Sequence, residues 1–73
     1  MNQFIMNNEI MTLTQFLKVN DYINSGGEAK YFLKEYVVLV NGIVCDQRGK
    51  KLYPKDIVIV NNDEYILIYD QES

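Results

Sequence analysis

Three basic side chains stand within four positions in the run Arg48-Gly49-Lys50-Lys51. Guanidinium and ammonium groups bind phosphate oxygens, and the glycine lets the backbone approach a ligand closely. The run therefore predicts a loop that binds a polyanion. A solvated turn between two strands explains the same residues, since lysines are common on protein surfaces.

A second pair of cations, Lys30 and Lys34, lies one helical turn apart. Residues at this spacing are neighbours on a helix surface, so the two ammonium groups should stand together. We expect them on the side away from Phe32 and Leu33. The alternative is an ordinary exposed flank on which neighbouring glutamates oppose the lysines.

The chain of 73 residues has a net charge of −3, which argues weakly against nucleic-acid binding. All seven basic residues nevertheless lie between Lys18 and Lys55, where four acidic residues leave a local surplus of three. Two predicted helix N-termini would add unpaired backbone N–H groups, which favour an anion. Charge segregation therefore predicts a local phosphate-binding face.

Six tyrosines invite a base-stacking hypothesis, because aromatic faces beside basic groups bind unpaired bases. Most are expected to be structural. Tyr31 and Tyr53, which lie close to lysines in the sequence, remain as candidates.

Enzymatic activity is not indicated. The sequence has no histidine, no serine in a nucleophile-elbow setting and no paired carboxylates with an acid–base partner. The single cysteine, Cys45, is expected to be a small, half-buried apolar group. With no second cysteine and no histidine, we predict no disulfide, catalytic residue, metal site or cofactor. Gly26-Gly27 lacks the other residues of a nucleotide-binding loop.

Neither a basic leader before an apolar run nor an apolar stretch of membrane length occurs in the sequence. We therefore expect a cytoplasmic protein with no membrane partner and no small-molecule substrate.

Two capping-box patterns predict where helices begin. In such a box a serine or threonine side chain accepts a hydrogen bond from the N–H three residues on, and the side chain there reaches back. Thr12 with Gln15 opens a helix that runs to about Asp21, and Ser25 with Glu28 opens a second helix.

The second helix carries an apolar face for burial, because Ala29, Phe32, Leu33 and Tyr36 recur at i, i+3, i+4 and i+7. After it, Asn41-Gly42 predicts a type I′ hairpin turn, in which both central residues need positive φ.

Apolar and β-branched runs predict the strands, and a polar turn at 61–63 joins the last two. The expected strands are 4–6, 38–40, 43–44, 57–60 and 65–69. These elements predict an α+β fold in which two short helices pack on one face of a small, mainly antiparallel sheet of four to five strands. We expect a single domain over residues 1–73.

Four segments, taken in their order and spacing, resemble the S-four (S4) RNA-binding domain, a module named after a protein of the small ribosomal subunit. They cover about Leu13 to Val60 and are Leu13-x-x-Phe16-Leu17, Ser25-Gly26-Gly27-Glu28-Ala29-Lys30, Val38-x-Val40-Asn41-Gly42 and Pro54-Lys55-Asp56. The serine-glycine-glycine segment, the basic run and the short length are similar to the stand-alone bacterial YaaA-type subfamily.

The resemblance implies a helix–turn–helix–hairpin arrangement, the alpha-L motif, which presents a surface to structured RNA. It implies that Ser25 caps the second helix at the RNA edge, that Gly27 permits close backbone approach and that Lys30 faces phosphate. Arg48, Lys50 and Lys51 would extend that surface.

Three positions depart from the family pattern. Gly26 stands where many members carry arginine, which removes a phosphate-binding fork. Tyr36 stands where glycine commonly ends the second helix, so that the left-handed cap is either strained or replaced. Lys55 replaces the glycine of a Pro-Gly-Asp turn, which predicts a type I turn instead of type II.

The leading hypothesis is a non-enzymatic module that binds the phosphates and shape of structured RNA, with ribosomal RNA as one candidate. The residues expected to bind are Ser25, Gly27, Lys30, Lys34, Arg48, Lys50 and Lys51. The alternative is a protein–protein adaptor that uses an acidic side of the sheet, including Glu64 and Asp70, or an exposed strand edge.

Overall fold

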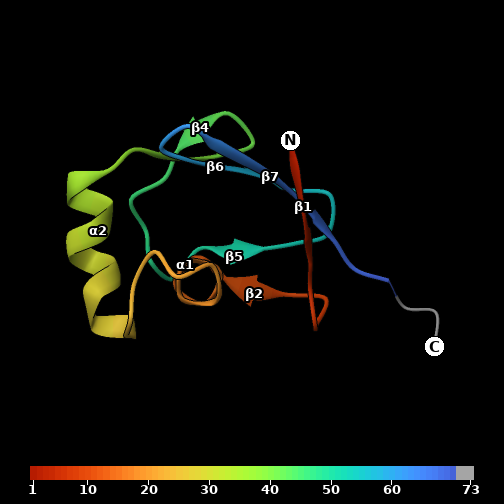
Figure 1. The fold of residues 1–73 in the computed structure, drawn as a ribbon, viewed down its shortest axis with the longest axis horizontal. Helices are drawn as coiled ribbons and strands as arrows, with labels where there is room; N and C mark the ends of the chain where they lie inside the picture. Colours follow the sequence, from red (N-terminus) through yellow and green to blue (C-terminus); the bar gives the residue numbers. More distant parts are fainter. Residues whose placement is uncertain (71–73) are drawn as a thin grey trace.

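The computed structural model describes residues 1–70 of the chain, which form short helices and strands (Figure 1). In chain order the elements are β1 (Asn2–Ile5), β2 (Met11–Thr12), α1 (Leu13–Val19), the 3₁₀ turn η1 (Gly26–Glu28), α2 (Ala29–Glu35), β3 (Val38–Val40), β4 (Ile43–Val44), β5 (Lys51–Leu52), β6 (Ile57–Val60) and β7 (Asp63–Ile68). The predicted α+β class is confirmed. The single domain predicted over 1–73 stays a prediction, and residues 71–73 lie outside the described part.

The main sheet has five strands in the order β1-β7-β6-β3-β4. Its neighbours are antiparallel except for β1 and β7, which run parallel with Asn2 opposite Tyr65 and Ile5 opposite Ile68. The sheet is therefore mainly antiparallel, as expected. The parallel pairing of the first and last strands was not anticipated, because it joins residues more than 60 positions apart.

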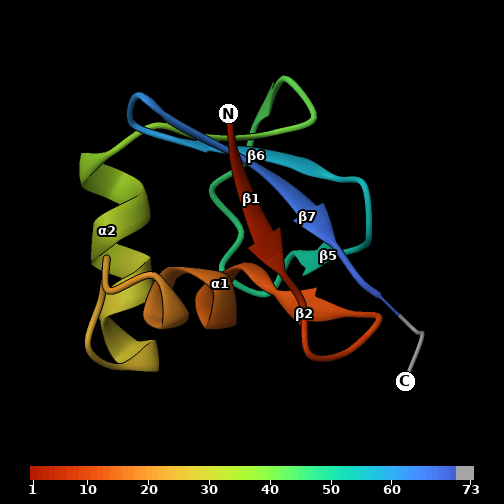
Figure 2. The ribbon, with the colours of Figure 1, turned by 45° about the vertical axis from the view of Figure 1, so that its right-hand side comes forward.

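A second, two-stranded sheet pairs β2 with β5, with Met11 opposite Leu52 and Thr12 opposite Lys51. Figure 2 shows this small sheet at the start of α1, with β5 on the side toward the main sheet. Within residues 1–70, no helix has the length and apolar character needed to cross a membrane.

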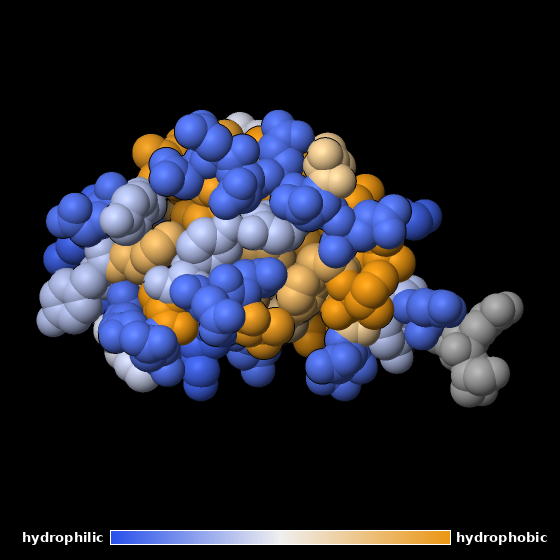
Figure 3. Space-filling view, viewed as in Figure 1, coloured by the Kyte–Doolittle hydropathy of each residue, from blue (hydrophilic) through white to orange (hydrophobic). Residues whose placement is uncertain are grey.

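The core lies between the helices and the inner face of the main sheet. On the surface in Figure 3, hydrophilic residues cover much of the face, with apolar residues between them. On β6 the residues alternate, so that Val58 and Val60 are fully buried while their neighbours are half-buried. The buried apolar side chains are Met6, Leu13, Phe16, Leu17, Ile23, Ala29, Leu33, Val38, Val40, Leu52, Val58, Val60 and Leu67. The predicted face of the second helix is buried at Ala29 and Leu33.

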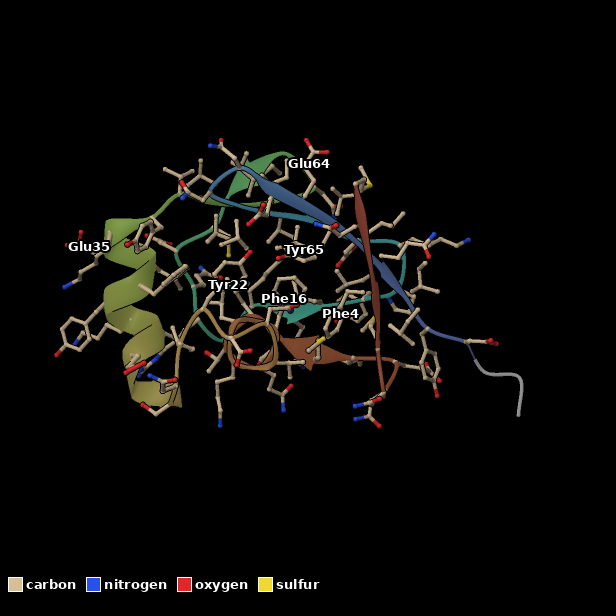
Figure 4. All side chains as sticks on the ribbon, in the orientation of Figure 1. Phe4, Phe16, Tyr22, Glu35, Glu64 and Tyr65 are labelled. Atoms are coloured by element: carbon tan, nitrogen blue, oxygen red, sulfur yellow. The ribbon has the colours of Figure 1, made fainter. Side chains whose placement is uncertain are left out.

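Aromatic rings form the centre of this core (Figure 4). Phe16 meets Phe4 and Tyr65 edge-on, each at a centroid distance of 5.1 Å. Beside them, the Tyr22 hydroxyl shares a hydrogen bond with the Tyr65 hydroxyl and donates to Asp63 Oδ2 at 3.1 Å. Partial burial raises the pKa of Tyr22 well above its usual range, and the hydrogen bonds to Tyr65 and Asp63 add to the rise.

This shift predicts a loss of stability at alkaline pH. The pKa of Tyr22 is higher in the folded state than in the unfolded state. The contribution of Tyr22 to the free energy of unfolding is therefore complete below the unfolded pKa of about 10 and is lost as pH rises above it. Tyr22→Phe cannot ionise, so its free energy of unfolding should fall less between neutral pH and about pH 11. Urea unfolding across this range, followed by circular dichroism, measures the difference. Parallel pH profiles for the two proteins would contradict the assignment.

Helix α1 begins with the predicted capping box. The N–H of Gln15 donates to Thr12 Oγ1 at 3.2 Å, and the N–H of Thr12 donates to Gln15 Oε1 at 2.9 Å. Both bonds satisfy donors that the first turn of a helix leaves open.

The prediction of a capping box at Ser25 is wrong. Ser25 has extended backbone angles, but its side chain makes no capping hydrogen bond. The Glu28 carboxylate instead accepts from the N–H of Asn24 at 2.7 Å, one residue before the predicted partner. A tight 3₁₀ turn precedes α2, in which the Glu28 N–H donates to Ser25 O at 3.1 Å. In this turn the Ser25 side chain does not make the hydrogen bond that a capping box requires.

The two serine/threonine positions should therefore respond differently to alanine. Thr12→Ala is expected to cost about 1 kcal/mol of unfolding free energy, because a real cap is lost. Ser25→Ala should change it by less than about 0.5 kcal/mol, as for a surface residue without such a role. Urea unfolding measures both, with Thr12→Ser as the variant that keeps the hydroxyl. Equal losses at the two positions would contradict the structure.

The hairpin turns agree with the sequence. Asn41 and Gly42 both have positive φ, 54° and 83°, and Val40 pairs with Ile43 across them, as a type I′ turn requires. The second hairpin is tighter than expected, since Val60 pairs directly with Asp63. Tyr36 ends α2 in an extended conformation, so the left-handed glycine cap is replaced and not strained.

The type I turn predicted at Pro54-Lys55 is wrong. Lys55 has a φ of 75°, which suits the third residue of a type II turn, and the N–H of Asp56 donates to Tyr53 O at 3.1 Å. Two bonds to β7 impose this shape, because the Lys55 N–H donates to Leu67 O and the Leu67 N–H donates to Asp56 O.

Lys55→Gly is therefore expected to raise the free energy of unfolding by about 0.5–1 kcal/mol, since glycine adopts positive φ without a Cβ clash. Lys55→Ala removes the same charge but keeps the clash, so it should bring no gain. Urea midpoints of the three proteins test this. A gain shared by both variants would mean that charge, and not backbone strain, was relieved.

Candidate nucleic-acid interface

The loop between β4 and β5 is fastened to the first turn of α1. The backbone N–H and the hydroxyl of Thr14 both donate to Arg48 O, at 3.0 and 2.8 Å. The N–H of Leu13 donates to Lys50 O at 2.8 Å. These bonds hold the basic loop in one place on the molecule.

They also correct the expectation that the N-terminus of α1 favours an anion. Its first three backbone donors are taken by Lys50 O, Arg48 O and Thr12 Oγ1. The helix end therefore positions the loop and offers none of these N–H groups to a phosphate.

Basic residues from α2 and from the loop line one groove of about 450 Å³. In the ribbon, the segment after β4 descends beside α2 on its way to β5 (Figure 1, Figure 2). The groove residues are Lys30, Leu33, Lys34, Asp46, Gln47 and Arg48. Two lysines of α2 and an arginine from a distant loop thus share one concave surface.

Leu33 lies on the same groove as the two lysines, so the expectation that Lys30 and Lys34 stand on the opposite side of α2 from it is wrong. Positions i, i+3 and i+4 share one helix face, so the buried Leu33 contributes apolar surface to the groove beside the two lysines. Asp46 contributes one carboxylate to the groove and opposes its three cations.

The other predicted binding residues lie outside this groove. Lys50 lines a neighbouring hollow that shares Asp46 and Gln47 with it. Lys51 belongs to β5 and lines neither hollow, and Ser25 and Gly27 lie at η1. The structure therefore unites three of the predicted residues, places one next to them and leaves three apart.

Thr14 was missed by the sequence analysis although it positions Arg48. No local pattern marks it, because its partner is 34 residues further along the chain. Cys45 is half-buried as predicted, with its thiol 3.7 Å from Gln47 O. Among residues 1–70, no cluster of carboxylate, cysteine or histidine side chains is arranged to hold a metal ion.

Comparison with known proteins agrees with this fold. The family model of the S4 domain matches residues 4–68, which is most of the chain. The chain therefore belongs to the S4 domain family, and the resemblance found in the sequence is confirmed.

A particular relative is the probable ribosome maturation protein RlbA of Bacillus subtilis (strain 168). The two are 51% identical over 57 residues, which covers 78% of this chain and 80% of the relative. No solved structure matches the chain.

Proposed function

We propose that this protein is a non-enzymatic module that binds structured RNA through the groove between α2 and the loop before β5. The observation that carries the proposal is the presence of Lys30, Lys34 and Arg48 on one concave surface. An arginine fork and two ammonium groups around one hollow suit a run of backbone phosphates. Lys50, in the neighbouring hollow, would extend the path of the phosphates.

The charge balance fits modest, salt-sensitive binding. Each lysine or arginine that neutralises a phosphate releases condensed counterions, so affinity falls steeply with added salt. Asp46 in the groove and the net charge of −3 oppose the attraction. We therefore propose recognition of phosphates and shape, without readout of base sequence. In this proposal Ser25, Gly27 and Lys51, which lie outside the groove, make further contacts with the same RNA.

The relative suggests where such an RNA occurs. It is described as a ribosome maturation protein, and this chain belongs to the same RNA-binding family. We propose ribosomal RNA, or a precursor of it, as the first target to examine.

The direct test is a titration of fluorescently labelled ribosomal RNA hairpins with the purified protein over a series of salt concentrations. We expect saturable binding with a log–log salt slope of about −2 to −3, the value for three phosphate contacts. Absence of binding at low salt, or binding without salt dependence, would overturn the proposal.

An adaptor role is the second candidate. The observation that favours it is the short edge strand β4, whose Ile43 and Val44 are both exposed. Glu64 also points outward from β7 (Figure 4). Pull-down from nuclease-treated lysate separates the two candidates. A partner that is retained after RNA removal and is insensitive to Lys34→Glu would favour the adaptor.

A further inference from the structure

Tyr31 is the most exposed of the six tyrosines, with 64% of its surface accessible. It projects from α2, between the two groove lysines in the sequence. The Lys30 ammonium lies 5.8 Å from the centroid of its ring. A large aromatic ring is thus presented to solvent beside a cation of the basic groove.

Tyr31 does not itself line the groove, but helix geometry places it beside the groove lysines. Tyr31 is one residue after Lys30 and three before Lys34, and residues three apart are surface neighbours on a helix. A polyanion that follows Lys30 and Lys34 would therefore pass within reach of the Tyr31 face.

We propose that Tyr31 stacks on an unpaired base of the RNA whose phosphates occupy the basic groove. This inference rests on the proposed function and adds a substrate class, namely structured RNA with a bulged or loop nucleotide next to a helix. Stacking on an aromatic face accepts any base, so it selects for an unpaired nucleotide and not for a sequence. The adjacent ammonium of Lys30 would pair with the phosphate of the same nucleotide.

The other exposed tyrosines suit this role less well. Tyr36 is 47% exposed, but its ring already packs on Phe32 with a centroid distance of 4.7 Å and an interplanar angle of 34°. Tyr53, at 45%, lies after β5, and neither of its neighbours in the sequence lines the basic groove, whereas Tyr31 follows Lys30. Tyr53 is therefore a matched control, an exposed tyrosine without the neighbouring cations of the groove.

The test uses two hairpin RNAs whose strands are joined by a linker without bases. They differ only by one unpaired nucleotide, a fluorescent adenine analogue bulged from the stem. The full-length protein and its Tyr31→Ala, Tyr31→Phe and Tyr53→Ala variants are titrated against both. We expect Tyr31→Ala to weaken binding to the bulged RNA about tenfold and to abolish the fluorescence change of the analogue. Tyr31→Phe, which keeps an aromatic face, and Tyr53→Ala should bind like the unaltered protein. The fully paired hairpin should not distinguish any of the four proteins.

Failure of the stacking proposal is distinct from failure of the proposed function. If Tyr31→Ala binds both hairpins as the unaltered protein does, with a normal salt slope, stacking is refuted while groove binding stands. Equal weakening on both hairpins also refutes stacking, because a paired base offers no free face. If the unaltered protein binds neither hairpin at low salt, both proposals fail together.

Discussion

Replacing Phe16 by alanine is expected to lower the free energy of unfolding by about 3–5 kcal/mol. Phe16 is fully buried on α1, and its ring packs against Phe4 of β1 and Tyr65 of β7. Its removal leaves a cavity where the helix meets the parallel strand pair, and the surroundings can fill it only in part. At about 0.05–0.15 kcal/mol per residue, a chain of 73 residues has a total stability of about 4–11 kcal/mol. The variant should therefore lose a large share of its stability.

Urea unfolding followed by circular dichroism measures this loss. Should Phe16→Ala be unfolded without denaturant, Phe16→Leu provides the measurement, with an expected loss of about 1–2 kcal/mol. Val19→Ala is the matched control, because Val19 lies on the same helix with its side chain exposed, and we expect a change within about 0.5 kcal/mol. A loss below about 1 kcal/mol for Phe16→Ala would contradict the described core.

The largest functional effect is expected from Lys34→Glu combined with Arg48→Glu. This pair takes one cation from α2 and one from the loop, so it alters both walls of the groove. We expect affinity for structured RNA to fall about tenfold to a hundredfold and the log–log salt slope to become shallower by about 2, because two phosphate contacts are lost. Binding titrations at several salt concentrations measure both quantities.

Two further variants test whether the groove itself, and not the total charge, governs affinity. Lys18→Glu with Lys55→Glu changes the net charge equally but lies outside the groove, so its binding should fall much less. Asp46→Asn removes the opposing carboxylate and should tighten binding about two- to threefold by lessening repulsion. If the control pair weakens binding as much as the groove pair, total charge and not the groove governs affinity. An unchanged salt slope in the groove pair would also count against the groove.

The contrast between Thr12 and Ser25 shows how far a local sequence pattern can predict a helix cap. Both begin with the same serine/threonine signal, yet only Thr12 forms the capping box. At Ser25 the double glycine allows a tight 3₁₀ turn, and the Glu28 side chain reaches Asn24 instead. The four-residue pattern begins at Ser25, so it could not predict that the N–H of Asn24, one position earlier, would bind the Glu28 side chain instead.

The candidate site shows the same division. The Lys30–Lys34 neighbourhood could be predicted, since one helical turn sets it. The position of Arg48 beside these lysines could not be predicted, because it depends on hydrogen bonds that Thr14 of α1 donates to Arg48 O, 34 positions along the chain. Likewise, the sequence placed the Lys55 turn correctly but not its type, which bonds to Leu67 on β7 impose.

The order and spacing of the sequence motifs indicated the family. The other features that could be predicted from the sequence are local: the α1 start at Thr12, the Asn41-Gly42 turn and the strand at 57–60. These follow from hydrogen bonds and φ preferences among near neighbours. The tertiary structure alone decided the parallel pairing of β1 with β7, the left-handed Lys55 and the shared groove of three cations. Each of these depends on contacts between segments that are distant in the sequence, and such contacts form only when the chain folds.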